Sequence, residues 1–232
     1  MLGTVSDLGS SPAVVSGNAE HTRTSSSELV EAFRMVRTAV TFIAIEQPIE
    51  SIAVTSADRG EGKTMTALNL ARTMAWEGRS VLLVEADLRR PSLAKRLAIT
   101  DSKGLSDVLL QDTALDAAIA GAESWGMSVL VAGGRPPNAA ELLGSSHMHR
   151  IQEKLAADYD LVIYDLPPLL PVSDALVMSK QVDAVILVAS EKVSKVGNVT
   201  TALEMLQDSS ANVIGAVLNR TRATTSYYGD DS

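Results

Sequence analysis

Six short apolar runs, each about the length of a buried β-strand, recur along this sequence from residue 51 onward. They occupy residues 51–56, 80–86, 127–133, 160–165, 183–189 and 212–219. Helical patterns separate most of them, at residues 63–77, 146–157 and 195–207, with shorter stretches at 91–97, 104–110, 114–120 and 172–180. This alternation predicts an α/β fold: a mostly parallel, doubly wound sheet with helices on both faces. Functional groups in such a sheet belong at the carboxyl ends of the strands.

The composition supports one compact domain and excludes several kinds of site. The chain has 232 residues, of which 46% are hydrophobic but only 3% aromatic, so aliphatic side chains must fill the core. It contains no cysteine, which excludes disulfides and thiolate metal sites and is compatible with a reducing cytoplasm. Its formal net charge of −8 argues against general nucleic-acid binding. No apolar run is long enough to span a bilayer, so we expect a soluble chain whose attachment to a membrane needs a partner.

Both ends of the chain differ in composition from its middle. Residues 1–27 contain seven serines and three glycines without sustained periodicity, and we expect a flexible tail there. Residues 28–222 form the predicted domain, and residues 223–232 form a second flexible tail. A helix is expected to begin near Ser27, a plausible N-cap, because apolar residues then recur at spacings of three and four. These residues are Leu29, Phe33, Val36, Val40 and Ile43.

A phosphate-binding loop is predicted directly after the first apolar run. The sequence SADRGEGKTMT follows that run, and it contains the end of the pattern G-x-x-x-x-G-K-[ST] immediately before a helix. Gly60 and Gly62 allow backbone N–H groups to turn toward phosphate oxygens, which the helix N-terminus also favours. Lys63 brings a cation to the outer phosphates, and Thr64 offers a hydroxyl to Mg²⁺. The first glycine of the pattern is replaced by Ala57.

Carboxylates follow two of the predicted strands. Glu85 and Asp87 are two residues apart, so on an extended chain they point the same way. Asp165 ends the strand at 160–165 and is followed by Leu166 and two prolines. In a nucleotide-binding sheet such carboxylates hold Mg²⁺ directly or through water, and one of them can accept a proton from an attacking hydroxyl. Together with the phosphate loop upstream, they favour a shared Mg–ATP site over isolated, solvated strand ends.

Several stretches of the sequence resemble one family. ADRGEGKT is similar to the Walker A motif of the bacterial tyrosine kinases of capsule and exopolysaccharide synthesis, which are cytoplasmic autokinases of the deviant phosphate-loop class. EADLRRPSL is similar to their second acidic motif, D-x-D-x-R, with Glu85 in the first acidic position. VIYDLPP is similar to their Walker B motif, with Asp165 as its acid and Leu166 where the family often has Ser or Thr. The resemblance runs from about Glu28 to the C-terminus.

This resemblance implies a site for ATP and Mg²⁺. Four residues would act in catalysis: Lys63, Glu85, Asp87 and Asp165. Either Asp87 or Glu85 would accept the proton of the tyrosine. The Mg²⁺ ion would be held by Thr64, Asp87 and Asp165. The nucleotide would be contacted by Asp58, Arg59, Gly60, Glu61, Gly62, Lys63, Thr64, Met65 and Asn219.

The same resemblance implies protein partners. ELVEAFRMVRT carries the family's E-x-x-R-x-x-R oligomer motif at Glu31, Arg34 and Arg37, and on a helix these residues lie beside one another, away from the apolar stripe. A ring-like homo-oligomer is implied, in which the tail of one subunit reaches its neighbour's site; a solvated helix face is the alternative. A membrane-anchored polysaccharide co-polymerase as activator and a cognate tyrosine phosphatase are implied as separate partners. The chain would then be cytoplasmic, recruited to the inner face of the plasma membrane.

The C-terminal sequence TSYYGDDS places two of the four tyrosines, Tyr227 and Tyr228, where they cannot pack. An exposed tail tyrosine suits a substrate that must enter an active site. We therefore expect both to be phosphoacceptors of a protein-tyrosine autokinase that regulates polysaccharide polymerisation or export. Two alternatives stay open. A catalytically weak nucleotide-binding scaffold is compatible with Glu85 and Leu166. A division- or partition-type ATPase shares the fold, but residues 57–59 lack the additional lysine usual in that class.

Overall fold

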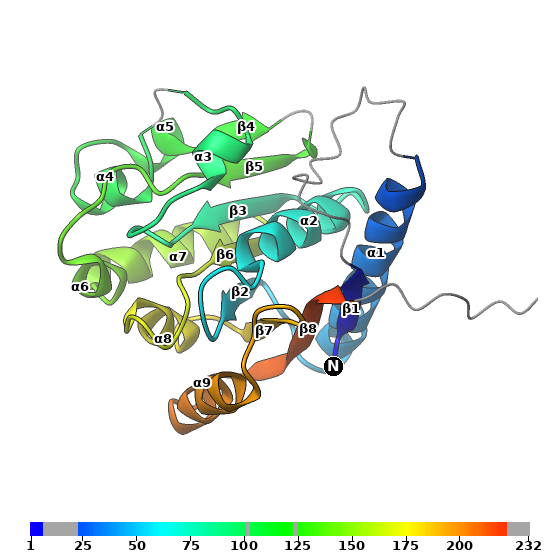
Figure 1. The fold of residues 1–232 in the computed structure, drawn as a ribbon. Coiled ribbons are helices and arrows are strands. Elements are labelled where there is room, and N and C mark those ends of the chain that lie inside the picture. Colours follow the sequence, from blue (N-terminus) through cyan, green and yellow to red (C-terminus); the bar gives the residue numbers. More distant parts are fainter. Residues whose placement is uncertain (7–22, 101–102, 123–124, 222–232) are drawn as a thin grey trace, which may run out of the picture.

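The computed structural model describes residues 1–232 except for 7–22, 101–102, 123–124 and 222–232 (Figure 1). In this described part, eight strands form one sheet in the order β1-β8-β7-β2-β6-β3-β5-β4, and only the β4–β5 pair is antiparallel. The strands are β1 (Gly3–Ser6), β2 (Ser51–Ser56), β3 (Val81–Glu85), β4 (Ala120–Ala122), β5 (Met127–Leu130), β6 (Leu161–Asp165), β7 (Ala184–Ser190) and β8 (Val213–Thr221). The predicted fold class and all six predicted strands are confirmed.

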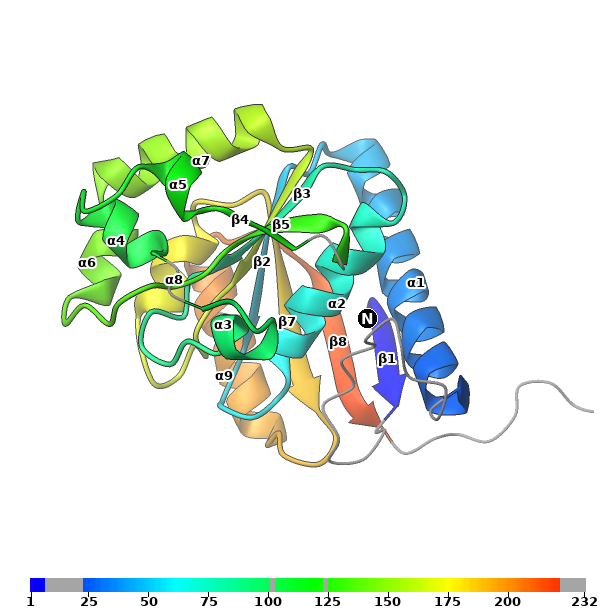
Figure 2. The ribbon, with the colours of Figure 1, turned by 90° about the horizontal axis from the view of Figure 1, so that it is seen from above.

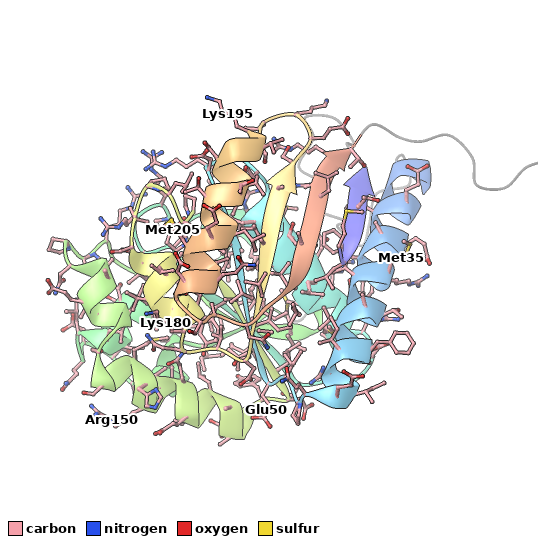
Figure 3. All side chains as sticks on the ribbon, turned by 90° about the horizontal axis from the view of Figure 1, so that it is seen from below. Met35, Glu50, Arg150, Lys180, Lys195 and Met205 are labelled. Carbon is pink, nitrogen blue, oxygen red and sulfur yellow. The ribbon has the colours of Figure 1, made fainter. Side chains whose placement is uncertain are left out.

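Helices cover both faces of the sheet. They are α1 (Arg23–Glu46), α2 (Lys63–Ala75), α3 (Leu93–Arg96), α4 (Leu105–Leu109), α5 (Leu115–Ala118), α6 (Ala139–Leu143), α7 (Ser146–Asp158), α8 (Asp174–Ser179) and α9 (Val196–Asp208). Successive strand residues point to opposite faces, so in β3 Leu82 belongs to one core cluster and Leu83 to the other. One cluster packs under α1 and α2, the other under α7, α8 and α9 (Figure 2). Figure 3 shows the second face, with Arg150 on α7 and Met205 on α9.

The prediction of a flexible tail over residues 1–27 is wrong at its beginning. Gly3–Ser6 forms the edge strand β1, which pairs in parallel with β8, and the amide of Leu2 donates to the carbonyl oxygen of Ala216 at 2.8 Å. Leu2 is buried, and a Cβ on Gly3 would lie 2.8 Å from Val36 Cγ2 of α1. Such a short strand has no period that a sequence could reveal, because its contacts with β8 and α1 are all distant along the chain.

Two helix boundaries also differ from the prediction. Helix α1 begins at Arg23, four residues before Ser27. The helical pattern at 114–120 divides, because α5 ends at Ala118 and the next residues pair with β5 as an antiparallel edge strand. Residues 7–22 of the predicted N-terminal tail and the predicted tail at 223–232 lie outside the described residues.

Candidate functional site

The phosphate loop joins β2 to α2, which begins at Lys63. Gly60 and Gly62 adopt left-handed backbone conformations, with φ of +81° and +100°, that residues with side chains rarely take. At Gly62 a Cβ would also lie 1.9 Å from Asn219 Nδ2. Ala57, where the pattern has its first glycine, is buried and is not among the described residues with positive φ. Alanine is therefore compatible with the loop at that position, whereas the two glycines are required.

Side chains from neighbouring segments hold this loop in place. Glu61 is buried: its Oε2 accepts the N–H of Asp58 at 2.8 Å, and its Oε1 accepts the hydroxyl of Ser194. Asn198 donates to the Asp58 carboxylate, and Asn219 Nδ2 donates to the carbonyl oxygen of Glu61 at 3.0 Å. Three predicted nucleotide contacts thus lie together around the loop. Sequence analysis missed Ser194 and Asn198, although both come after β7 at the carboxyl edge of the sheet, where functional groups are expected.

Lys63 lies between two carboxylates at the carboxyl edge of the sheet. Its Nζ is 2.9 Å from Asp87 Oδ2 and 3.3 Å from Asp165 Oδ1. Asp165 is fully buried, and this burial raises its pKa although the charge of Lys63 and a hydrogen bond from Thr64 oppose the shift. Burial also disfavours the charge on Lys63, but Asp165 and Asp87 together outweigh it, so the pKa of Lys63 is raised. The structure therefore brings together three of the four residues predicted to act in catalysis.

The fourth, Glu85, has its carboxylate occupied by backbone amides. Its Oε1 accepts the N–H groups of Ser92 and Leu93, the latter at 2.8 Å, and its Oε2 accepts the N–H of Ala132 at 3.2 Å. Burial raises the pKa of Glu85, against these three hydrogen bonds, which favour the charged form. Glu85 thus ties the start of α3 to the segment after β5. Asp87 lies beyond the end of β3, so the alternation of an extended strand does not apply to it, and the two acids make separate contacts.

A cavity of about 180 Å³ opens beside Lys63 and Asp87. Besides Lys63, two predicted nucleotide contacts, Arg59 and Gly60, line it, together with residues that sequence analysis missed: Arg89, Arg90, Pro167, Pro168, Pro171 and Val172. Arg89 donates to both oxygens of the fully buried Asp174, at 2.7 and 3.0 Å, and these bonds raise its pKa. The sequence signal for them was the pair of arginines, Arg89 and Arg90, two residues after Asp87. Several cations around one cavity suit phosphate groups.

Two further positions from the sequence lie away from this cavity. Met65 is in the first turn of α2, and its sulfur lies 3.4 Å from Arg96 Nη1; it is not among the residues that line the cavity. Leu166 is fully buried in the core cluster under α7, α8 and α9. Leu166, where the family often has Ser or Thr, therefore belongs to the hydrophobic core.

The residues present fit Mg²⁺ bound together with nucleotide phosphates. Over the residues the structure describes, no group of three or more His, Cys, Asp or Glu side chains is arranged to hold a metal ion alone. Asp165 Oδ2 is buried and has no hydrogen-bond partner, and the Thr64 hydroxyl hydrogen-bonds to the Asp165 carboxylate. Mg²⁺ typically takes one or two carboxylates and completes its shell with phosphate oxygens and water. Thr64, Asp87 and Asp165 are of the right chemical type for such a site.

The three residues of the predicted oligomer motif do not share one environment. Arg34 Nη1 pairs with Glu31 at 3.2 Å on the exposed side of α1. Arg37 instead reaches Glu77, beyond the end of α2, at 2.9 Å, and its side chain is only 20% exposed. Arg37 thus joins α1 to the α2 end within one copy, while Arg34 and Glu31 remain open to solvent. The predicted phosphoacceptors Tyr227 and Tyr228 lie outside the described residues.

Comparison with known sequences agrees with the geometry. A family model described as an AAA domain matches residues 49–215. Tyrosine-protein kinase YwqD of Bacillus subtilis (strain 168) is 35% identical over 203 residues, covering 86% of this chain and 86% of YwqD. Tyrosine-protein kinase etk of Escherichia coli (strain K12) is also 35% identical, over 200 residues. That match covers 85% of this chain but only 28% of etk.

Solved structures show the same relationship. The chimerical protein CapA2B2 superposes with a TM-score of 0.86 at 29% identity, over 96% of this chain and 95% of the other. The septum site-determining protein MinD of Pyrococcus horikoshii OT3, complexed with Mg-ADP, superposes with a TM-score of 0.63 at 26% identity, over 74% of this chain and 70% of MinD. With a phosphate loop, a lysine held between two acids, and relatives that match most of its length, the chain belongs to the bacterial tyrosine-protein kinase family.

Proposed function

We propose that this chain is a protein-tyrosine autokinase. It would transfer the γ-phosphoryl group of ATP to tyrosines in the tails of its own copies and so regulate exopolysaccharide or capsule polymerisation and export. The observation that carries the proposal is the position of Lys63, between Asp87 and Asp165 at the end of a phosphate loop. Tyrosine as the acceptor is supported by the names of the relatives. Mg-ADP in MinD supports the same nucleotide and ion here.

In this proposal the residues of the site divide the tasks of phosphoryl transfer among them, and Asp87 has two of these tasks. Lys63 and the loop amides bind the phosphates and stabilise the charge that develops on them during transfer. Mg²⁺, when bound, supplies further charge neutralisation, and Thr64, Asp87 and Asp165 would hold it. The tyrosine oxygen forms a bond to the γ-phosphorus as the bond from that phosphorus to the oxygen of ADP breaks. Asp87, which lines the cavity beside Lys63, accepts the tyrosine proton. Glu85 does not line that cavity, and it positions backbone instead, because its carboxylate accepts three backbone N–H groups.

Tyr227 and Tyr228 are the proposed acceptors, so replacing both by phenylalanine should remove most self-labelling by Mg–ATP. Nucleotide binding should not change, because the residues assigned to the phosphates and to Mg²⁺, which include Lys63, Asp87 and Asp165, are not altered. Mass spectrometry of ATP-treated protein gives the positions of the phosphates. Tyr164 serves as a built-in reference, since it is buried and burial raises its pKa, which disfavours it as a nucleophile. Phosphate mainly on Tyr159 or Tyr164, or on no tyrosine, contradicts the proposal and favours a nucleotide-binding scaffold.

A homo-oligomer belongs to the same proposal, with Arg34 and Glu31 on the exposed side of α1 as its contact residues. We expect Arg34→Ala to produce smaller assemblies, because Arg34 is 53% exposed and its only described partner, Glu31, is on the same helix. Arg37→Ala is the matched comparison: it breaks an ion pair within one copy and should lower stability more than assembly. Light scattering with and without Mg–ATP measures the mass of the assemblies that each of the two variants forms. An unchanged mass for Arg34→Ala in both states would restore the solvated-face alternative.

The remaining partners belong to the same proposal. Along the described residues, no helix is both long enough and apolar enough to cross a membrane. We propose a cytoplasmic chain that a membrane-anchored polysaccharide co-polymerase recruits to the inner face of the plasma membrane, and that a cognate tyrosine phosphatase dephosphorylates. The similarity to the chimerical CapA2B2 supports a two-protein unit of this kind. A division-type ATPase is disfavoured by the absence of lysine from residues 57–59.

A further inference from the structure

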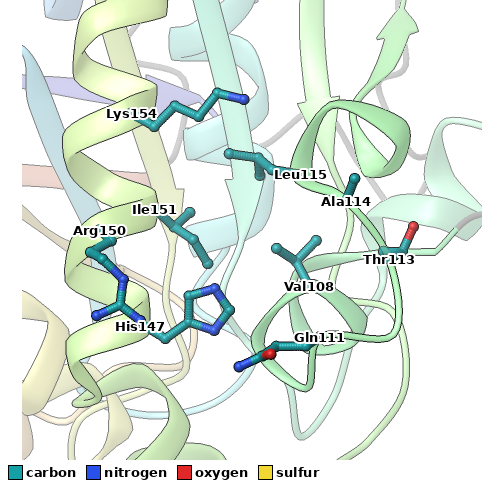
Figure 4. A pocket seen from close by; sticks show the side chains of 9 residues that line it. All are labelled: Val108, Gln111, Thr113, Ala114, Leu115, His147, Arg150, Ile151 and Lys154. Atoms are coloured by element: carbon teal, nitrogen blue, oxygen red, sulfur yellow. The ribbon is translucent and has the colours of Figure 1, made fainter.

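A second cavity, of about 560 Å³, lies between α7 and the α4–α5 segment (Figure 4). It shares no lining residue with the cavity beside Lys63. Its apolar lining includes Val108 of α4, Leu115 of α5 and Ile151 of α7. The volume is within the range of sites that bind small ligands, and a surface of aliphatic side chains suits a flat aromatic ring. The second cavity is therefore a candidate binding site independent of the nucleotide.

Cationic and imidazole side chains border this second cavity along one face of α7. They are His147, Arg150 and Lys154, spaced by three and four residues, so they follow one another along the helix. Figure 4 shows His147 and Lys154 reaching from α7 toward the α4–α5 side. In a chain with a formal net charge of −8, such a local group of basic side chains favours an anionic ligand.

The three side chains differ in how far their hydrogen-bonding capacity is already used. Lys154 Nζ pairs with Asp116 at 2.5 Å, and this bond raises the pKa of Lys154. His147 Nδ1 is 3.3 Å from the carbonyl oxygen of Leu109; because a carbonyl only accepts, Nδ1 carries a proton and Nε2 is left for another group. The side chain of Arg150 is exposed and makes no ion pair or hydrogen bond with any residue in the described part of the chain. The Arg150 guanidinium is thus available to an incoming anion, and His147 Nε2 is one further hydrogen-bonding atom at the same cavity.

We propose that the second cavity binds a phosphotyrosyl side chain from the phosphorylated tail of a second copy of this chain. Its ring would lie on Val108, Leu115 and Ile151, and its phosphate would meet Arg150 and His147. Such a phosphate carries roughly −1.5 to −2 charges at neutral pH and has three acceptor oxygens for the guanidinium. The proposal rests on the proposed function, which supplies the phosphotyrosine. It assigns the second cavity a role in holding the reaction product between copies.

The C-terminal tail has the negative charge that the basic side chains of the second cavity require. The distance from the end of β8 to α7 favours the tail of a second copy over the tail of the same copy. Tyr227 and Tyr228 are followed by Gly-Asp-Asp, so the phosphorylated segment is strongly acidic. The last described strand, β8, lies beside the edge strand β1 (Figure 2). It is five strand positions from β5, and the usual spacing of strands in a sheet makes this a separation of about 24 Å. Seven extended residues from Thr221 to Tyr228 span at most about 25 Å, which leaves almost no length for the path to α7. A tail from another copy has no such limit.

Fluorescence anisotropy with a labelled synthetic peptide of residues 222–232 tests the proposal. The partner is the full chain, treated with phosphatase and kept free of nucleotide. We expect the peptide phosphorylated on both tyrosines to bind at least about tenfold more tightly than the unphosphorylated peptide. Mg–ATP should not displace it, because the two cavities share no lining residue. Equal binding of the two peptides, or displacement by Mg–ATP, overturns the proposal.

Variants locate the site. Arg150→Gln combined with His147→Gln should weaken binding of the phosphorylated peptide by about tenfold or more. Lys180→Gln, which removes one exposed positive charge at the end of α8 (Figure 3), should leave it unchanged. The proposal is contradicted if the double variant and Lys180→Gln lose peptide binding equally, or if neither of them loses it. An anti-phosphotyrosine blot of the parent chain with Mg–ATP separates the two hypotheses: a blank blot refutes the kinase, whereas the synthetic phosphopeptide still tests the second cavity.

Discussion

Replacing Lys63 by methionine is expected to lower self-phosphorylation by about 10³-fold or more. Methionine keeps an unbranched side chain but removes the charge that the outer phosphates require. In the free protein Lys63 also lies within 3.3 Å of both Asp87 and Asp165, so it offsets the repulsion between two buried carboxylates. Without it the pKa of Asp165, already raised by burial, rises further. A protonated Asp165 is a poor magnesium ligand, so Mg–ATP affinity should fall as well.

Transfer of radiolabelled phosphate from ATP measures the activity of the Lys63 variant, and far-ultraviolet circular dichroism checks that its helices are intact. Lys180→Met is the matched control, because Lys180 is an exposed lysine at the end of α8 and lines neither cavity. It should retain parental activity. Self-phosphorylation at the parental rate in the Lys63 variant would remove the assigned site altogether.

Asp165→Asn is expected to lower activity by about 10²-fold or more while stabilising the free protein, on the order of 1 kcal/mol. The carboxyl is fully buried, one of its oxygens has no hydrogen-bond partner, and its pKa is raised. These observations indicate that the negative charge of Asp165 lowers the free energy of unfolding of the free protein. Asparagine occupies nearly the same volume without the charge, but it is a weaker ligand for Mg²⁺. Lys63 keeps Asp87 as its partner.

The pH dependence follows from the direction of the shift. Because the folded-state pKa of Asp165 lies above the ordinary value of 3.8, the folded protein holds this proton more tightly than the unfolded chain. The contribution of Asp165 to the free energy of unfolding is thus complete below about pH 3.8 and is lost as the pH rises through the raised folded value. Asparagine does not titrate. The stability advantage of Asp165→Asn should therefore grow with pH across that window, and a constant difference would contradict the assignment.

Glu85→Gln is the informative comparison for Asp165→Asn. The amides of Ser92, Leu93 and Ala132 all donate to Glu85, and a glutamine NH₂ group cannot accept. This variant should lose roughly 1–3 kcal/mol of stability but less activity than Asp165→Asn. Urea unfolding can be followed by tryptophan fluorescence, since the Arg72 guanidinium stacks on Trp76 and Trp125 at 4.2 and 4.9 Å. If Glu85→Gln is the less active of the two variants, the roles given to these acids are wrong.

Residues that carry a motif were predictable because their chemistry and their neighbours in the chain suffice to define them. Lys63 follows a glycine and opens a helix, and Asp165 ends an apolar strand, so both positions at the carboxyl edge could be inferred. Contacts between distant segments could not. Ser194 and Asn198 hold Glu61 and Asp58 across more than 130 residues of sequence, and no local pattern marks those pairs.

Local pattern was enough for the order of strands along the chain, the parallel α/β class and the identity of the phosphate loop, because hydrophobic period and glycine chemistry act over a few residues. Long-range packing assigned the rest. It gave Glu85 and Asp87 different partners: backbone amides donate to Glu85, whereas the ammonium group of Lys63 donates to Asp87. It also joined β1 to β8 and formed the second cavity between α7 and the α4–α5 segment. Each of these depends on burial and on contacts between segments far apart in sequence, which a single sequence does not encode locally.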